Sequence, residues 1–219
     1  MKPFLITTFL SILFLNATSQ SKSDIDTLIN KICLSLKADT SSNDSIRYNN
    51  IVNNYLLPYL KDKRSKKSKK ISEYVYYRMQ RDCIEFNDLM IRFFPPKDDS
   101  RFVLDEPVDK IDSLACFDFF TFKNFKYLES SGDTTNTEIS DSIWIDHFTD
   151  RTYSKCGFNK INECEFVLTF IKGNNLIRKN YSKKGEHFRY TILRRIDNYY
   201  ELLLETEGVS RKSIIRLYY

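Results

Sequence analysis

The chain has 219 residues, of which 42% are hydrophobic and 15% aromatic, so it can bury a core and is too apolar for a disordered protein. Only five glycines and five prolines occur, which excludes collagen-like and proline-rich classes. The formal net charge of +5 is a mild excess. It is too small to indicate nucleic-acid binding, so we expect no nucleic acid among the partners.

The first 19 residues have the pattern of a secretory signal peptide. Lys2 supplies a positive charge, residues 4–15 are apolar, and the small residues 17–19 predict cleavage before Gln20. The apolar segment is shorter than the roughly 20 residues of a membrane-spanning helix. We therefore expect a secreted or periplasmic protein with no transmembrane segment.

Residues 20–94 are predicted to be a helical region. Apolar residues recur at the helical spacing in three segments, 24–37, 48–56 and from about 72 to 92. Pro58 is expected to end or kink the second helix, because the residue before a proline disfavours helical geometry.

The segment 61–70 reads KDKRSKKSKK and contains no apolar residue. Like charges in a block repel and stay hydrated, which favours a solvated loop between helices. The alternative is contact with an anionic surface, for which the candidate residues are Lys66, Lys67, Lys69 and Lys70.

The prolines at positions 95 and 96 predict a linker over residues 95–114. From residue 115 to 219 the pattern changes to the period of β-strands. Strands are predicted over 116–122, 126–130, 142–148, 164–171, 175–181, 187–196, 199–206 and 210–218, with a polar loop over 131–141. The turns between the last five are short enough to join only antiparallel neighbours.

The sequence therefore predicts an α+β protein. An N-terminal helical hairpin or three-helix unit precedes an antiparallel up-and-down β-meander, which forms a small barrel or a strongly bent sheet. In the strand over 199–206, apolar residues alternate with Glu201 and Glu205, which predicts one buried face and one face in water.

This strand order resembles that of lipocalin-like barrels at the level of topology. The lipocalin barrel opens with a Gly-x-Trp signature, whereas here Ser142 stands two positions before Trp144. The resemblance therefore implies the topology of the barrel and no particular ligand.

All five cysteines follow the predicted cleavage site, so at most two disulfides form within the chain. Cys33 and Cys83 lie on the inward faces of predicted helices and are expected to pair, the alternative being two unpaired, buried thiols. Cys156 and Cys164 flank a turn-like segment and are expected to form a second bridge, with Cys116 as the competing partner. The chain has no C-x-x-C and only two histidines, so we predict no metal site and no cofactor.

Aromatic residues of the predicted meander form the candidate ligand-binding site. They could line an apolar pocket at the mouth of a barrel, or they could form a packed core. The residues concerned are Phe166, Phe170, Phe188, Tyr190, Tyr199 and Tyr200.

No catalytic residues are predicted. Asp146 and His147 are neighbours on a strand and so point to opposite faces. Glu201 and Glu205 would lie roughly 13 Å apart along a strand, farther than the carboxylates of glycosidases. We expect an exported, soluble, non-enzymatic protein that buries a small apolar molecule or a partner segment against the aromatic face. The alternative is a secreted inhibitor or immunity-type protein that has no small ligand and binds a protein partner through residues 61–70 or an exposed sheet edge.

Overall fold

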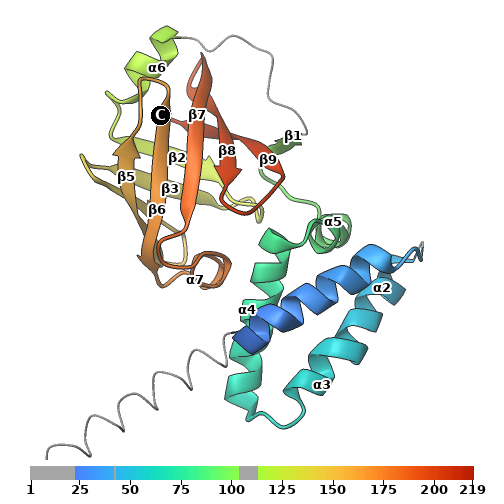
Figure 1. Cartoon of the computed structure of the whole chain (residues 1–219). Helices are drawn as coiled ribbons and strands as arrows, with labels where there is room; N and C mark the ends of the chain where they lie inside the picture. The colour runs from blue at the N-terminus through green and yellow to red at the C-terminus, as the bar shows by residue number, and fades with distance from the viewer. Residues whose placement is uncertain (1–22, 42, 104–112) are drawn as a thin grey trace, which may run out of the picture. The chain divides into compact units, whose positions relative to one another are not determined.

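The computed structural model describes residues 23–41, 43–103 and 113–219 (Figure 1). The chain divides into two compact units, one up to Leu89 and one from Met90 onward. The predicted signal peptide over residues 1–19 lies outside the described residues. None of the helices in the described ranges combines the length and apolar character that a membrane span requires.

The first unit is helical, as predicted. A helix over residues 23–38 is followed by α2 (Asp44–Ile51), the π-helix η1 (Val52–Leu56), α3 (Leu57–Leu60), α4 (Ser65–Asp82) and α5 (Ile84–Phe93). Their apolar faces supply a buried core, which includes Ile32, Leu36, Val75, Met79 and Phe86. The helical spacing in the sequence therefore identified these faces correctly.

The helix does not end at Pro58, contrary to one of our expectations. Instead the turn before the proline widens into η1, in which the backbone N–H of Leu57 donates to the carbonyl of Val52, five residues back. Pro58 has no N–H for the carbonyl of Asn54, and in a regular α-helix its ring would clash with that carbonyl. The wider π-turn places the proline within a continuous helical path.

Residues 65–70 of the lysine-rich segment are helical where we predicted a loop, whereas residues 61–64 form a turn before α4. Lys66 and the three lysines after it lie in the first two turns of α4, and all four side chains are exposed. The segment lacks glycine and proline, and lysine is a good helix former, so solvation and helix formation are compatible here. The expected third helix is in fact two helices, because Cys83 has extended backbone angles (φ −128°, ψ 105°) between α4 and α5.

The predicted Cys33–Cys83 disulfide is confirmed. Its Cα atoms lie 5.6 Å apart, within the usual range for a disulfide, and the bridge links the first helix to the junction of α4 and α5.

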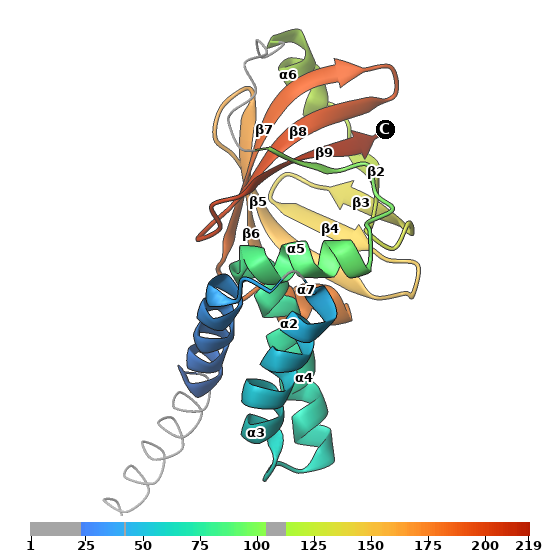
Figure 2. The same cartoon turned by 90° about the vertical axis from the view of Figure 1, so that its right-hand side faces the viewer.

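The second unit is a closed, antiparallel eight-stranded barrel with one extra strand, which confirms the α+β prediction (Figures 1 and 2). The barrel strands are β2 (Asn124–Leu128), β3 (Thr134–Ile139), β4 (Ile143–His147), β5 (Tyr153–Lys160), β6 (Glu165–Gly173), β7 (His187–Ile196), β8 (Tyr199–Thr206) and β9 (Lys212–Tyr218). Each strand pairs with the next, and β9 closes the barrel by pairing with β2 at Lys126 and Tyr218. The extra strand β1 (Arg101–Val103) belongs to the segment expected as a linker and pairs with β9.

The predicted strand over 116–122 is instead the helix α6 (Ser113–Phe119), followed by a turn. Ala115, Cys116 and Phe119 are buried while Phe117 is exposed, so the burial has helical spacing. Phe119 packs inside the barrel against the rings of Phe125 and Phe166. This tertiary contact overrides the strand preference of an aromatic-rich sequence.

The predicted strand over 175–181 is the helix α7 (Leu176–Tyr181). The side chain of Asn175 accepts hydrogen bonds from the backbone N–H groups of Ile177 and Arg178, and so caps this helix. Helices α6 and α7 lie at opposite ends of the barrel (Figures 1 and 2).

Two strands occupy segments that we expected to be loops. β3 lies within the predicted polar loop over 131–141, and β5 includes the first half of the predicted turn over 156–164. The inward-facing residues of β3 include Thr135 and Thr137, both buried. A strand with polar residues on both faces has no apolar alternation, so the sequence pattern did not reveal it.

The predicted Cys156–Cys164 bridge is wrong. Cys164 pairs with Cys116, the competing partner, and ties the helix α6 to the hairpin before β6. Cys156 is a free, buried cysteine on β5.

The outward face of β8 is covered, contrary to the expected wet face. Glu201 is 2% exposed and accepts hydrogen bonds from Arg194 and Arg216. The nearby Leu203 packs in a small apolar cluster that includes Val103 of β1. Two arginines of the neighbouring strands thus cover Glu201, and the extra strand contributes to the burial of Leu203.

Candidate functional site

The helical unit contains an apolar cavity of about 300 Å³. This volume is at the small end of the range for ligand pockets. The cavity is lined by Ile32, Tyr48, Ile51, Val52, Leu56, Ser72, Glu73, Val75, Tyr76, Tyr77, Met79 and Phe86. Its walls therefore come from the first helix, α2, η1, α4 and α5.

The polar residues of this lining are Tyr48, Ser72, Glu73, Tyr76 and Tyr77. Burial raises the pKa of Tyr76, and the neighbouring Tyr77 and Tyr48 raise it further. Burial also raises the pKa of Tyr77, with a further contribution from Glu73. These phenols stay protonated at neutral pH, so the cavity combines a mainly apolar lining with neutral phenol groups and the carboxyl group of Glu73.

The π-turn contributes directly to this cavity. Val52 and Leu56, the first and last residues of η1, both line it. π-turns inside α-helices occur frequently at functional sites. Sequence periodicity had placed both residues on an apolar helix face, but it could not distinguish a lined cavity from a filled core.

The predicted aromatic site lies inside the barrel. Phe166 and Tyr200 are fully buried, Phe170 is nearly so, and Phe188 and Tyr190 are half-buried. Tyr199 instead contacts the ring of Tyr218 at a tilted angle, and the guanidinium of Arg216 lies over its ring. Toward α6 the aromatic rings pack closely: Phe119 lies 5.4 Å from Phe166 and 5.1 Å from Tyr200, measured between ring centroids.

This arrangement matches the packed-core alternative for Phe166 and Tyr200. The Tyr200 hydroxyl is buried and has no hydrogen-bond partner among the residues that the structure describes, and burial raises the pKa of Tyr200 to about 12. A ligand-binding role for the five barrel residues stays a prediction.

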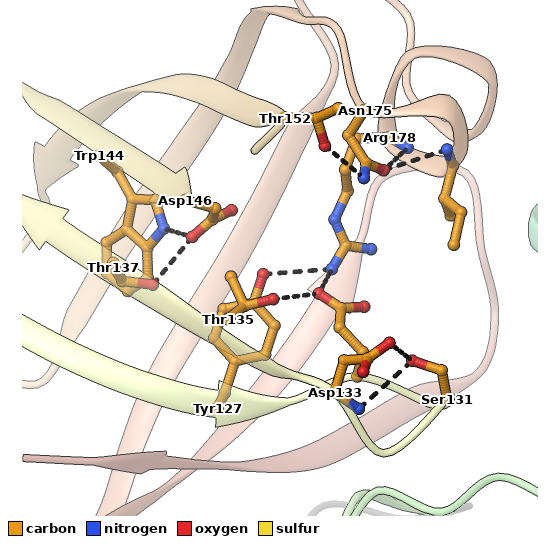
Figure 3. A network of polar contacts seen from close by, with 12 residues as sticks. Tyr127, Ser131, Asp133, Thr135, Thr137, Trp144, Asp146, Thr152, Asn175 and Arg178 are labelled. Carbon is orange, nitrogen blue, oxygen red and sulfur yellow. Dashed lines mark hydrogen bonds and ion pairs between the residues drawn. The ribbon is translucent and has the colours of Figure 1, made fainter. Parts of the chain in front are cut away.

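A polar network occupies the barrel interior, and sequence reasoning did not predict it (Figure 3). Asp146 is buried on β4, and its Oδ1 accepts hydrogen bonds from Trp144 Nε1 at 2.7 Å and from Thr137 Oγ1 at 2.9 Å. The strand register explains this geometry, because Thr137 lies directly across from Asp146 and Trp144 is two residues before it on the same face.

The second part of the network centres on Arg178 of α7 (Figure 3). Its Nη2 donates to Glu129 Oε1 at 2.8 Å and to the Tyr127 hydroxyl at 3.2 Å. Thr135 Oγ1 donates to the same oxygen of Glu129 at 2.9 Å. Arg178 thus links α7 to Tyr127 of β2 and, through Glu129, to Thr135 of β3, and its charge is paired with that of Glu129.

Burial shifts the pKa values of the inward-facing groups. It raises the pKa of Asp146, and the positive charge of Arg178 and the two hydrogen bonds only partly oppose this shift. It also raises the pKa of Tyr190 and Tyr127. The pKa of the Cys156 thiol rises to about 12 for the same reason, so this thiol is not an activated nucleophile.

The two residues that first suggested acid–base chemistry are separated as predicted. Asp146 faces the barrel interior, while His147 is exposed and lies 3.8 Å from Glu138. The sequence feature that could have revealed the contact between Trp144 and Asp146 is their spacing. The two residues are two positions apart, which places both side chains on one face of the strand.

The remaining predicted residues do not join these sites. Lys66, Lys67, Lys69 and Lys70 are exposed on α4, and a role in surface contact stays a prediction. Within the described ranges, Glu85 forms one possible ligand group with the two cysteines of the first disulfide. Those sulfurs share a covalent bond, and metal binding requires thiolates.

The chain was compared with protein-family models, with curated proteins and with solved structures, and none of them matches. The function must therefore be argued from the geometry of its sites.

Proposed function

We propose that this chain is an exported binding protein that holds a small apolar molecule in the cavity of its helical unit. The observation that supports this proposal is the cavity of about 300 Å³ with a mainly apolar lining. A well-formed apolar pocket with a few polar groups is the usual architecture of a small-molecule site.

The lining suggests the chemistry of the ligand. Ile32, Val75, Met79 and Phe86 offer apolar contact, so burial of a ligand's apolar surface would supply the affinity. The neutral phenol of Tyr76 could hydrogen-bond a single hydroxyl or carbonyl group. We therefore expect an uncharged ligand that is mostly apolar.

Export is part of the same proposal. It is supported by the signal-peptide pattern of the first 19 residues and by the two disulfides, which persist in oxidising compartments. The mass of the mature protein purified from its native host tests this, because cleavage before Gln20 predicts a specific mass. A mass that includes residues 1–19 would contradict export by cleavage.

Native mass spectrometry tests for the ligand itself. The protein is compared in its native state and after denaturation without reduction. Extra mass that is present only in the native spectrum would identify a bound molecule by its mass. We also expect the uncharged fluorescent probe N-phenyl-1-naphthylamine to bind at one site per chain.

A matched pair of variants locates the probe. Leu56 lines the cavity, whereas the adjacent Leu57 does not and is 53% exposed. Leu56→Phe places a larger side chain in the cavity and should weaken probe binding at least tenfold, while Leu57→Phe should leave it unchanged. Val52→Phe is a second cavity-filling variant. Equal binding by all three variants, or no binding by the wild type, would refute the small-ligand function and favour a protein partner.

A further inference from the structure

The barrel interior contains a carboxylate that is only half satisfied. Asp146 is 8% exposed, and its Oδ1 receives both of its hydrogen bonds, from Thr137 and Trp144. Across the described part of the chain, Oδ2 has no hydrogen-bond partner, yet it is not among the fully inaccessible oxygens. Figure 3 shows this oxygen turned toward the side of the network where Arg178 lies.

This carboxylate also lacks an ion-pair partner. The positive charge that acts on Asp146 is that of Arg178. The guanidinium of Arg178, however, forms an ion pair with Glu129, with 2.8 Å between Nη2 and Oε1. Among the residues that the structure describes, no cation lies within ion-pairing distance of Asp146. Arg178 is positive, whereas Glu129 and ionised Asp146 are negative, so the network carries one uncompensated negative charge. A buried charge is costly unless it is paired, so this position favours a cation.

Tyr190 supplies a second unused polar group. Its hydroxyl has no hydrogen-bond partner in the described ranges, and the side chain remains half-buried rather than sealed. Trp144 connects the two groups, because its indole N–H donates to Asp146 and its ring lies beside that of Tyr190. The ring of Tyr190 is nearly parallel to that of Trp144, with centroids 6.4 Å apart. An ammonium group near these rings would also gain from their negative faces.

We propose that the barrel binds a small organic amine at Asp146, at a site separate from the helical cavity. The ammonium group donates hydrogen bonds to Asp146 Oδ2 and to the hydroxyl oxygen of Tyr190. The apolar body of the amine packs against the half-buried aromatic side chains of Tyr190 and Phe188. Asp146 provides the charge selectivity, and the aromatic residues provide the contact area.

The test uses 2-phenylethylamine as the probe and the full mature chain with both disulfides. Trp144 is the only tryptophan of the sequence and donates its indole N–H to Asp146, so its emission reports directly on this site. Isothermal titration calorimetry should show saturable binding of one amine, with a parallel change in Trp144 emission. The neutral 2-phenylethanol should bind at least tenfold more weakly, and the anion 3-phenylpropionate more weakly still.

Two variants test whether amine binding depends on the negative charge of Asp146 rather than on a change in folding. Asp146→Asn keeps an oxygen to accept from Thr137 and Trp144 but removes the negative charge, so amine binding should weaken at least tenfold. Glu138→Gln removes an exposed carboxylate from the neighbouring strand β3 and should bind the amine like the wild type. Far-UV circular dichroism verifies that both variants fold.

The outcomes distinguish this inference from the proposed function. No amine binding, equal binding of the amine and the alcohol, or unchanged binding by Asp146→Asn would overturn the amine site. If Leu56→Phe abolished amine binding and Asp146→Asn did not, the amine would occupy the helical cavity. The inference would then fail, and the proposed function would be judged separately by the binding of N-phenyl-1-naphthylamine.

Discussion

Removing the Cys33–Cys83 disulfide should destabilise the helical unit selectively. The bridge closes a segment of 50 residues. In the chain-entropy model a loop of this length restricts the unfolded chain enough to stabilise the folded state by about 4 kcal/mol. The change we consider is Cys33→Ala with Cys83→Ala, which avoids placing a new hydroxyl at a position that is 1% exposed.

The second disulfide provides a matched control. Cys116 and Cys164 are 48 residues apart, so the same model gives about 4 kcal/mol for Cys116→Ala with Cys164→Ala. The two bridges lie in different compact units, however, and should affect different signals. Trp144 emission reports on the barrel, whereas the far-UV circular dichroism of helices reports mainly on the first unit.

Urea denaturation followed with both signals separates the two effects. We expect the first variant to lower the midpoint of the helical transition and the second to lower that of the Trp144 transition. A loss of less than about 1 kcal/mol in both variants would show that the entropic estimate fails here. Equal shifts of both signals in each variant would refute the view that the units unfold separately.

Three further predictions concern single groups. Iodoacetamide at pH 8 should label no cysteine in the native protein and one cysteine in unreduced denaturant, since Cys156 is buried and its pKa is raised to about 12; two or more labels would contradict the bridges. Lys66→Gln with Lys67→Gln should stabilise α4 by about 0.3–1 kcal/mol per charge at low salt, because lysines oppose the dipole at a helix N-terminus; thermal denaturation would reveal a loss instead if these lysines support the fold. Because the pKa of Asp146 is raised above its ordinary 3.8, the folded barrel holds this proton to higher pH than the unfolded chain, and stability relative to Asp146→Asn should fall as pH rises from about 4; a flat or rising difference in urea midpoints would show that the carboxylate is compensated.

Helices and apolar strands followed directly from local sequence patterns. The apolar spacing around Ile32, Val75 and Met79 predicted which helix faces would be buried. The alternation and short turns of the last three strands predicted an antiparallel meander, because such turns admit no other pairing. Cys33 and Cys83 could be paired from sequence because the helical spacing placed both on inward faces, and Cys83 is indeed buried, although it lies at the junction of α4 and α5.

The segments whose secondary structure was predicted wrongly have side chains whose contact partners lie elsewhere in the sequence. Thr135 and Thr137 read as loop residues because their partners, Glu129 and Asp146, lie elsewhere in the chain. The strand prediction around Phe119 failed because this ring fills the end of a barrel built by distant strands.

The amino-acid sequence by itself determined the class of the protein, the order of its helical and β regions, and its first disulfide. These properties depend on periodicity and turn length, which are local. Only the tertiary structure decided that Cys116 rather than Cys156 pairs with Cys164, and that Asp146 faces Arg178 across a polar interior. Closure of the barrel brings these groups together from separate strands and helices, and no spacing along the chain encodes which inward-facing groups will meet.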